Sequence, residues 1–257
     1  MARRTKIIAT IGPASEDEGT LRGMIEAGMD VARIGLAHGS LDEQVEKFQM
    51  VRKVSSDLGK HVGIVVDLPG PKVRCAPFDE GGIDLTEGAQ ISLGVEGSES
   101  SSDFINVDYP NLLQDVQLGD SLSFGDGQVV VSVEEREGDR LKARVVHGGR
   151  LDGRPGLHVP SDRLRLSSPT DHDLTLLDTF VELGTDMVAV SFVRSAHDIR
   201  RLGVEPAPRG PMIIAKIETK AAVANLEGII EASGAVMVAR GDLGSEADIE
   251  ELPHLQK

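Results

Sequence analysis

Short apolar runs recur along the chain, and longer stretches with helical periodicity separate them. Such runs are typical of strands that are covered on both faces of a parallel sheet. The runs lie at residues 6–12, 30–39, 61–70, 186–193, 211–218 and 235–240. The alternation of strand and helix predicts an α/β fold that is built from βα units.

The stretches between these runs carry apolar residues at the spacing of a helix. In residues 40–60 the apolar positions 41, 45, 48, 51 and 54 share one helical face. In residues 15–28 Ser15 is followed three residues later by Glu18, a pattern that predicts Ser15 as the residue that caps the helix. Both stretches are therefore expected to be helices that cover the sheet.

The sequence pattern changes between residues 70 and 165, where short segments of alternating apolar and polar residues are separated by glycines. This pattern predicts antiparallel hairpins in a small all-β module. We therefore expect a barrel domain made of residues 1–69 and 166–257, with a β-barrel-like domain of residues 70–165 inserted after the third strand.

The length of the chain limits the barrel. A complete (β/α)8 barrel of the TIM type takes ~250 residues, or ~31 for each βα unit. Once the insertion of about 95 residues is removed, roughly 160 residues remain, which is enough for five or six units. The sequence therefore predicts either an open sheet or an incomplete TIM-type barrel without its last two units.

Composition excludes several classes of protein. The 257 residues carry a net charge of −15, whereas a nucleic-acid surface needs clustered lysine and arginine. One cysteine allows no internal disulfide and indicates a reducing compartment. No apolar run approaches the ~20 residues that cross a bilayer. We expect a soluble cytoplasmic protein that binds neither nucleic acid nor membrane.

Charged side chains follow the predicted strands at their carboxyl ends, where parallel α/β folds place their working groups. These residues are Arg33, His38, Asp67, Lys72, Arg74, Lys216, Glu218, Arg240 and Asp242. Gly241 would let a ligand approach the backbone. We expect these side chains to converge on one rim of the sheet.

The convergent groups have complementary chemistry. Glu218 and Asp242 are hard oxygen ligands, and Mg²⁺ is typically held by one or two carboxylates together with substrate oxygens and water. Arg33, Arg74 and Lys216 are cations suited to a phosphate or to the negative charge of an enolate. The pattern predicts a magnesium-dependent site for a small phosphorylated or carboxylated substrate.

Several motifs, in order, resemble the pyruvate kinase family. They read "TKIIATIGPAS", "MIEAGMDVARIGLAHGS", "DLPGPKVR", "VVHGGRLDGRPGLHVP", "DMVAVSFVR", "IIAKIET" and "VMVARGDLGSE", and they cover essentially the whole chain. The resemblance implies a TIM barrel whose inserted B domain acts as a lid. It also implies the last step of glycolysis, in which phosphate passes from phosphoenolpyruvate to ADP with Mg²⁺ (or Mn²⁺) to give pyruvate and ATP.

The resemblance also implies roles for the residues of the rim. Arg33 would contact the substrate phosphate, and Lys216 would stabilise charge on the phosphoryl group and the enolate. Glu218 and Asp242 would hold the metal, with the amide of Gly241 and the substrate nearby. These roles agree with phosphoryl transfer, which depends mainly on positioning and on neutralisation of charge.

The resemblance places further residues near the nucleotide. Arg74 and His38 would lie towards ADP or ATP. The inserted domain departs from the family at His158, where asparagine is usual.

A second departure concerns a monovalent cation. Asp67 matches an acid of the family's K⁺ site, but Gly35 and Ala37 stand where the family usually has asparagine and serine. Lys72 stands where K⁺-dependent members carry glutamate and resembles the K⁺-independent members. We expect the ammonium of Lys72 to replace the ion, so that K⁺ is not required; the alternative is a cation site that has decayed.

The family's seventh and eighth strands and its C-terminal regulatory domain have no counterpart in this sequence. The chain is therefore expected to be a piece of a longer or split gene product, or a degraded paralogue. A homo-oligomer or a second chain that completes the barrel is also open. Two alternative functions remain: an inactive or ligand-binding remnant, and a magnesium-dependent C–C lyase acting on an oxaloacetate-like acid.

Overall fold

A computed structural model describes residues 4–95, 97–125, 127–160, 165–247 and 250–257. The chain divides into two compact units. The first unit contains the residues up to Pro71, Ser167–Ile217 and Ala222–Val238. The second unit contains Lys72–Leu166, Glu218–Ala221 and Ala239–Lys257. The sequence pattern had instead placed Glu218–Ala221 and Ala239–Lys257 in the barrel domain.

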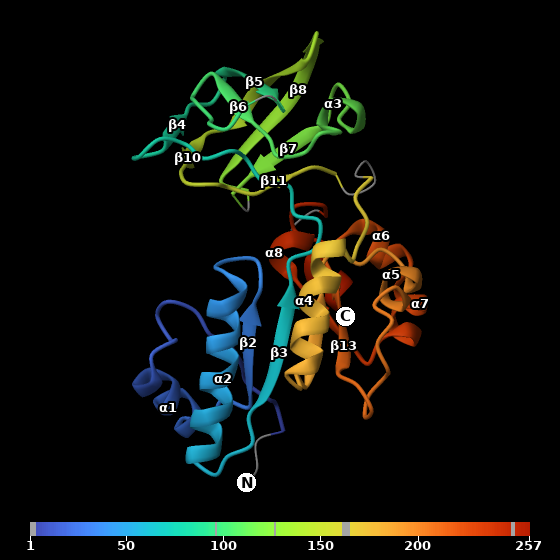
Figure 1. Cartoon of the computed structure of the whole chain (residues 1–257). Coiled ribbons are helices and arrows are strands. Elements are labelled where there is room, and N and C mark those ends of the chain that lie inside the picture. Colours follow the sequence, from blue (N-terminus) through green and yellow to red (C-terminus); the bar gives the residue numbers. More distant parts are fainter. Residues whose placement is uncertain (1–3, 96, 126, 161–164, 248–249) are drawn as a thin grey trace. The chain divides into compact units, whose positions relative to one another are not determined.

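The first unit is built on a parallel sheet (Figure 1). Its strands are β1 (Ile8–Thr10), β2 (Val31–Gly35), β3 (Gly63–Leu68), β12 (Met187–Val190), β13 (Met212–Ile217) and β14 (Ala235–Val238). Each strand pairs in parallel with the next of these strands along the chain. This order confirms the predicted TIM-type architecture with an inserted β domain, and the described residues contribute six strands to the sheet.

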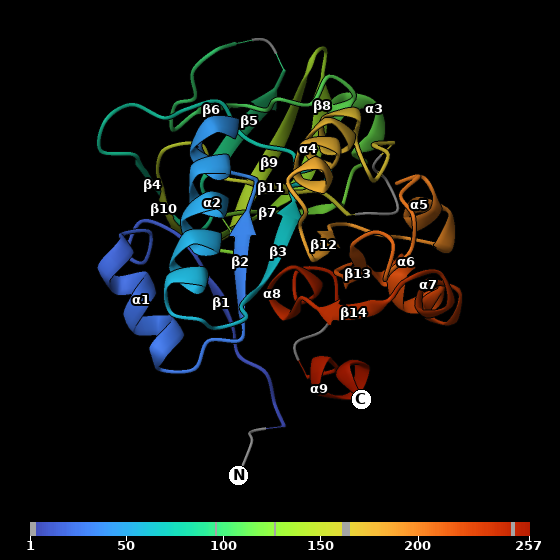
Figure 2. The ribbon, with the colours of Figure 1, turned by 60° about the horizontal axis from the view of Figure 1, so that its bottom comes forward.

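Helices follow the strands. They are α1 (Glu18–Glu26), α2 (Leu41–Asp57), α4 (Asp171–Glu182), α5 (Ala196–Arg200), α6 (Lys220–Ala224) and α7 (Leu226–Ala232). Both views show α2 beside β2 and α4 beside β3 (Figures 1 and 2). The main core lies between this helical layer and the sheet and contains fully buried residues such as Leu21, Ile34, Val51 and Phe180.

Two local predictions in the first unit were wrong. Helix α1 is capped by Asp17, whose side chain accepts from the amide of Thr20, whereas Ser15 accepts from the amide of Gly12 in the turn before the helix. The apolar spacing in residues 219–233 predicts one helix after β13, but this stretch forms α6 and α7 instead. Asn225 separates them, and its side-chain amide donates to the carbonyl of Arg194 at 3.0 Å.

The other face of the sheet carries a second, smaller apolar cluster, which includes Val65, Ala189 and Ile214. Side chains alternate between the two faces of a strand. The next positions on this face, two residues further along each strand, are Asp67, Ser191 and Lys216. A polar layer therefore lies directly above the apolar one at the carboxyl ends of the strands.

The described residues of the second unit form two β-sheets. Their strands are β4 (Ile83–Leu85), β5 (Gln90–Gly94), β6 (Phe104–Asn106), β7 (Ser121–Phe124), β8 (Val129–Glu137), β9 (Arg140–His147), β10 (Gly149–Leu151) and β11 (Leu157–His158). The larger sheet has the order β11-β7-β8-β9-β5-β6, and β10 pairs with β4. The pairing is antiparallel, as predicted, except that β5 and β6 are parallel.

The described residues of the second unit also form three short helices. One is α3 (Leu112–Asp115), which interrupts the predicted all-β module, and the others are α8 (Arg240–Leu243) and α9 (Leu252–Gln256). Strand β14 had been expected to run through Arg240, but this residue already begins α8. Across the described part of the chain, each helix is too short or too polar to cross a membrane.

Candidate active site

Asp67 is the centre of a charged cluster at the carboxyl end of the sheet in the first unit. Its Oδ2 atom lies 2.7 Å from Nε and 2.6 Å from Nη2 of Arg33. Its Oδ1 atom lies 3.3 Å from Nζ of Lys216. The side chains of Asp67 and Lys216 are 3% and 10% exposed, whereas that of Arg33 is 34% exposed. One buried carboxylate thus neutralises two cations, one of which faces solvent.

Two hydroxyl groups complete this cluster. Thr10 accepts a hydrogen bond from Nη1 of Arg33 at 2.9 Å, and Ser191 accepts one from Nζ of Lys216 at 2.8 Å. The sequence analysis missed both residues. The signal for Ser191 was its place directly after an apolar strand, in the same position that drew attention to the charged residues of the other strands.

The strand register explains why these side chains meet. Ala189 of β12 is level with Asp67 of β3, so Ser191 follows on the same face one step closer to the carboxyl ends. Lys216 lies on the interior face of β13, two residues after Ile214. The geometry is a direct result of parallel strands that end at one edge.

Gly35, which stands where the family usually has asparagine, leaves space beside Asp67. Gly35 is level with Asp67 in the pairing of β2 with β3. A Cβ atom added to Gly35 would meet no described atom within 4 Å. Ala37, the second departure, is exposed in the loop that follows. Neither position therefore offers a side-chain oxygen.

In the second unit, His158 faces a group of carboxylates. Its Nε2 atom lies 3.7 Å from Oε1 of Glu246, and Oε2 of Glu246 accepts from the amide of Lys220 at 2.8 Å. Burial lowers the pKa of His158, while the charges of Glu246 and Asp242 oppose that shift. His158, which stands where the family usually has asparagine, thus has acidic neighbours, and one of them, Asp242, is a predicted metal ligand.

The predicted metal ligands also belong to the second unit. Glu218 is 1% exposed, and Asp242 lies in α8 together with Gly241. Among the described residues there is no group of three or more His, Cys, Asp or Glu side chains that could hold a metal. Two carboxylates alone suit Mg²⁺, which usually retains water and takes substrate oxygens as its remaining ligands.

The remaining predicted residues lie outside the Asp67 cluster. His38 is exposed in the loop after β2, and the side chain of Gln44 donates to its carbonyl. In the second unit, Arg74 donates from Nη1 to the carbonyl of Arg154 at 3.3 Å. The side chain of Lys72 runs along Gly156, where an added Cβ would come within 2.7 Å of Cε. Of the predicted residues, the structure brings Arg33, Asp67 and Lys216 into contact.

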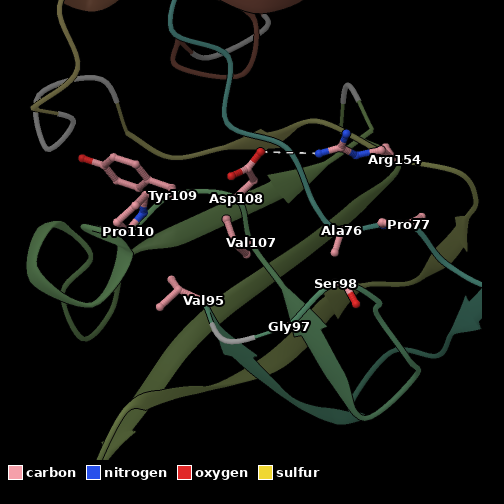
Figure 3. A pocket seen from close by; sticks show the side chains of 10 residues that line it. All are labelled: Ala76, Pro77, Val95, Gly97, Ser98, Val107, Asp108, Tyr109, Pro110 and Arg154. Atoms are coloured by element: carbon pink, nitrogen blue, oxygen red, sulfur yellow. Dashed lines mark hydrogen bonds and ion pairs between the residues drawn. The ribbon is translucent and has the colours of Figure 1, made fainter.

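A cavity of about 370 Å³ lies within the β module (Figure 3). Val95, Val107, Tyr109 and Pro110 are among the residues that line it. Asp108 and Arg154 point towards each other at this cavity and form an ion pair of 3.4 Å. The described residues that line the cavity do not include any predicted site residue, so it does not bear on the predicted rim.

Comparisons with known proteins agree with the motifs. The family described as "Pyruvate kinase, barrel domain" matches residues 2–257. The chain is 39% identical over 259 residues to a pyruvate kinase of Mycobacterium tuberculosis strain H37Rv, which covers all of this chain and 55% of the relative. A pyruvate kinase of Thermococcus litoralis is 37% identical over 258 residues, with 100% and 54% covered.

A pyruvate kinase of Corynebacterium glutamicum is 38% identical over 261 residues, which are 100% of this chain and 54% of the relative. The chain therefore spans about half the length of the curated relatives that it matches. The family match extends over both units and includes every residue of the predicted rim. Together with the architecture, it shows that the chain belongs to the pyruvate kinase family.

Proposed function

We propose that this chain carries the substrate- and metal-binding part of a pyruvate kinase, which transfers phosphate from phosphoenolpyruvate to ADP. The observation that carries the proposal is the contact of Arg33 and Lys216 with the buried Asp67 at the carboxyl end of the sheet. Phosphoryl transfer needs preorganised cations at the positions where negative charge develops. The cluster around Asp67 provides two such cations in a chain that belongs to this family.

The two cations would act at different points of the substrate. Arg33 is partly exposed and binds the phosphate, since a guanidinium has several donors in a fixed plane and keeps some after it pairs with Asp67. Lys216 is more buried and faces the oxygen on which enolate charge appears. A cation stabilises such charge more strongly in a site that excludes water.

The bonds that change are few. The bond from phosphorus to the enol oxygen breaks, a bond from phosphorus to an oxygen of ADP forms, and the enolate takes up one proton to become pyruvate. Asp67 takes no part in these bond changes. Its role is to hold Arg33 and Lys216 in place before the substrate arrives.

Glu218 and Asp242 are the residues that would hold Mg²⁺ (or Mn²⁺), with the amide of Gly241 available to the substrate. Glu218 follows Lys216 by two residues, so the proposed ligand and the proposed catalytic lysine leave the same strand. When bound, the metal supplies neutralisation of the charge on the substrate oxygens. The hard carboxylate oxygens of these two residues fit that ion.

The nucleotide and the monovalent cation complete the proposal. Arg74 and His38 are proposed to lie towards ADP, and residues 70–165 to act as the lid.

K⁺ is not required, because the ammonium of Lys72 takes the place of the ion. The absence of a side chain at Gly35, level with Asp67, supports this part of the proposal. A cytoplasmic location agrees with the single cysteine.

Phosphorus NMR on the purified chain tests the proposal. Phosphoenolpyruvate, ADP and Mg²⁺ are mixed with the parent chain, with Lys216→Met and with Lys53→Met, a control at an exposed lysine of α2. We expect ATP from the parent and from Lys53→Met but not from Lys216→Met, at equal rates with and without K⁺. No ATP from the parent would show that the chain alone is not a kinase. Oxaloacetate in a parallel sample tests the lyase alternative.

A further inference from the structure

We infer that Ser191 is a positioning residue that holds the ammonium of Lys216 in the direction needed for phosphoryl transfer. The inference rests on the proposed function, since it concerns the same lysine. Ser191 is 3% exposed and lies directly after β12. It would act through Lys216 and would not itself touch the reacting atoms.

The hydrogen bonds around Ser191 have a fixed direction. Nζ of Lys216 donates to Oγ of Ser191 at 2.8 Å, and this hydroxyl donates to Oδ1 of Asp67 at 3.4 Å. The same ammonium lies 3.3 Å from Oδ1 of Asp67. A hydroxyl can accept from the ammonium and donate to the carboxylate at once. The ammonium is therefore held from two sides.

This matters because a lysine side chain is long and flexible. The Asp67 contact by itself fixes the distance of the ammonium from one carboxylate oxygen but not the direction of its N–H groups. The Ser191 hydroxyl adds a second, directional contact before the substrate binds. Precise placement of a charged group contributes to rate because a small displacement weakens the stabilisation of the transition state.

The backbone around Ser191 is itself held in place. The hydroxyl of Ser168, which is fully buried, donates to the carbonyl of Ser191 at 2.6 Å. The next residue, Phe192, has a φ of 54°, in the left-handed region that non-glycine residues rarely adopt. Strained backbone of this kind persists where the surroundings fix it, and it clusters at functional sites.

Gly70 closes the other side of this turn. A Cβ atom at Gly70 would lie 2.9 Å from Cβ of Ser191 and 3.2 Å from its carbonyl oxygen. The chain after β3 therefore passes so close to Ser191 that only a glycine fits. A strained residue, a buried hydrogen bond and a close backbone contact all define the position of one serine.

The test compares Ser191→Ala with Ser55→Ala. Both changes remove a buried hydroxyl from the first unit, but Ser55 lies in α2 and donates to the carbonyl of Lys60, whereas the hydroxyl of Ser191 contacts Lys216. Ser191→Cys, which keeps the shape with a weak acceptor, serves if the alanine variant does not fold. Steady-state kinetics with phosphoenolpyruvate, ADP and Mg²⁺ gives kcat and KM. Acetic anhydride labelling, read by mass spectrometry without substrate or metal, gives the reactivity of the Lys216 amine.

We expect the Ser191 variants to lower kcat by about tenfold to a hundredfold, with KM for phosphoenolpyruvate changed by less than about threefold. We expect them to raise the labelling rate of Lys216 by about tenfold, because the amine loses a hydrogen bond. Ser55→Ala should leave both unchanged. Parent-like labelling in the Ser191 variants, or equal effects of Ser55→Ala, would overturn the inference. If the parent forms no ATP, the proposed function fails for this chain, and the labelling still decides whether Ser191 holds Lys216.

Discussion

Asp67 and Arg33 form a two-point contact in which Nε and Nη2 of the guanidinium both lie within 2.7 Å of Oδ2 of the carboxylate. The carboxylate is buried and the guanidinium is partly open to solvent. Because Lys216 is bound to the other oxygen of Asp67, the loss of this carboxylate would leave two cations close together without their common partner.

Asp67→Asn should therefore lower the free energy of unfolding by about 3 kcal/mol, since removing one member of a buried pair leaves uncompensated charge. Urea denaturation measures the change. The matched control is Glu205→Gln, which breaks an exposed ion pair with Arg209 at 3.2 Å. That change should cost less than about 0.5 kcal/mol. Equal effects of the two substitutions would contradict the central role of Asp67.

Gly70→Ala should destabilise the chain more than Gly59→Ala does. Both glycines have a positive φ, of 68° and 61° respectively, so both pay the cost of a left-handed alanine, about 1 kcal/mol. An added Cβ meets Ser191 at 2.9 Å in the first case and no described atom within 4 Å in the second. The difference between the two melting temperatures measures the crowding at Ser191. Identical melting temperatures would show that the turn can relax.

Tyr109 is the single tyrosine of the chain, and its hydroxyl donates to the buried carboxylate of Asp115. Tyr109→Phe should cost about 1–3 kcal/mol, because Asp115 loses a donor. Arg165, whose Nε lies 2.9 Å from Asp115, still pairs with that carboxylate. Thermal denaturation measures the loss, and a phenylalanine variant as stable as the parent would rule out this role.

The same tyrosine predicts a dependence on pH. Burial, and then the hydrogen bond to Asp115, raise the pKa of Tyr109. The unfolded state loses its phenolic proton near pH 10, whereas the folded state keeps it. The stabilising contribution of Tyr109 is therefore fully present below about pH 10, and it is lost as the pH rises through the pKa of the folded state. Absorbance at the tyrosinate band reports this one residue, and ionisation below pH 10 would contradict the prediction.

Cys75 offers an independent probe of the β module. Burial raises the pKa of this thiol to about 12. Since an unfolded thiol ionises near pH 9, the thiol contributes stability below that pH and loses it as the pH rises towards 12. A disulfide reagent at pH 8 should label Cys75 at the rate at which the module opens, and urea should accelerate the labelling. Immediate labelling of the folded chain would show that the thiol is accessible.

The architecture could be predicted from sequence because its causes are local. Continuous apolar strands such as Met187–Val190, separated by amphipathic helices, indicate a covered parallel sheet. The rule that parallel strands deliver their working groups at the carboxyl ends then placed Arg33, Asp67 and Lys216 near one another, and the structure brings these three side chains into contact.

Other features depend on how separate parts of the chain meet, which the local sequence does not determine. Ser191 gains its importance from strand register and from the approach of Gly70, neither of which a single serine reveals. The parallel pairing of β5 with β6 depends on how two separate strands meet, which the pattern of either strand alone does not show. Asp17 and Ser15 are equally suitable caps by residue type, and the choice depends on where the chain turns into α1.

Gly35 leaves open space beside Asp67, while the two cations that neutralise Asp67 are covalent parts of the same chain. A tethered cation has an effective concentration set by the backbone, and it cannot be diluted or exchanged. The charge of this buried carboxylate is thus balanced by side chains of the protein itself.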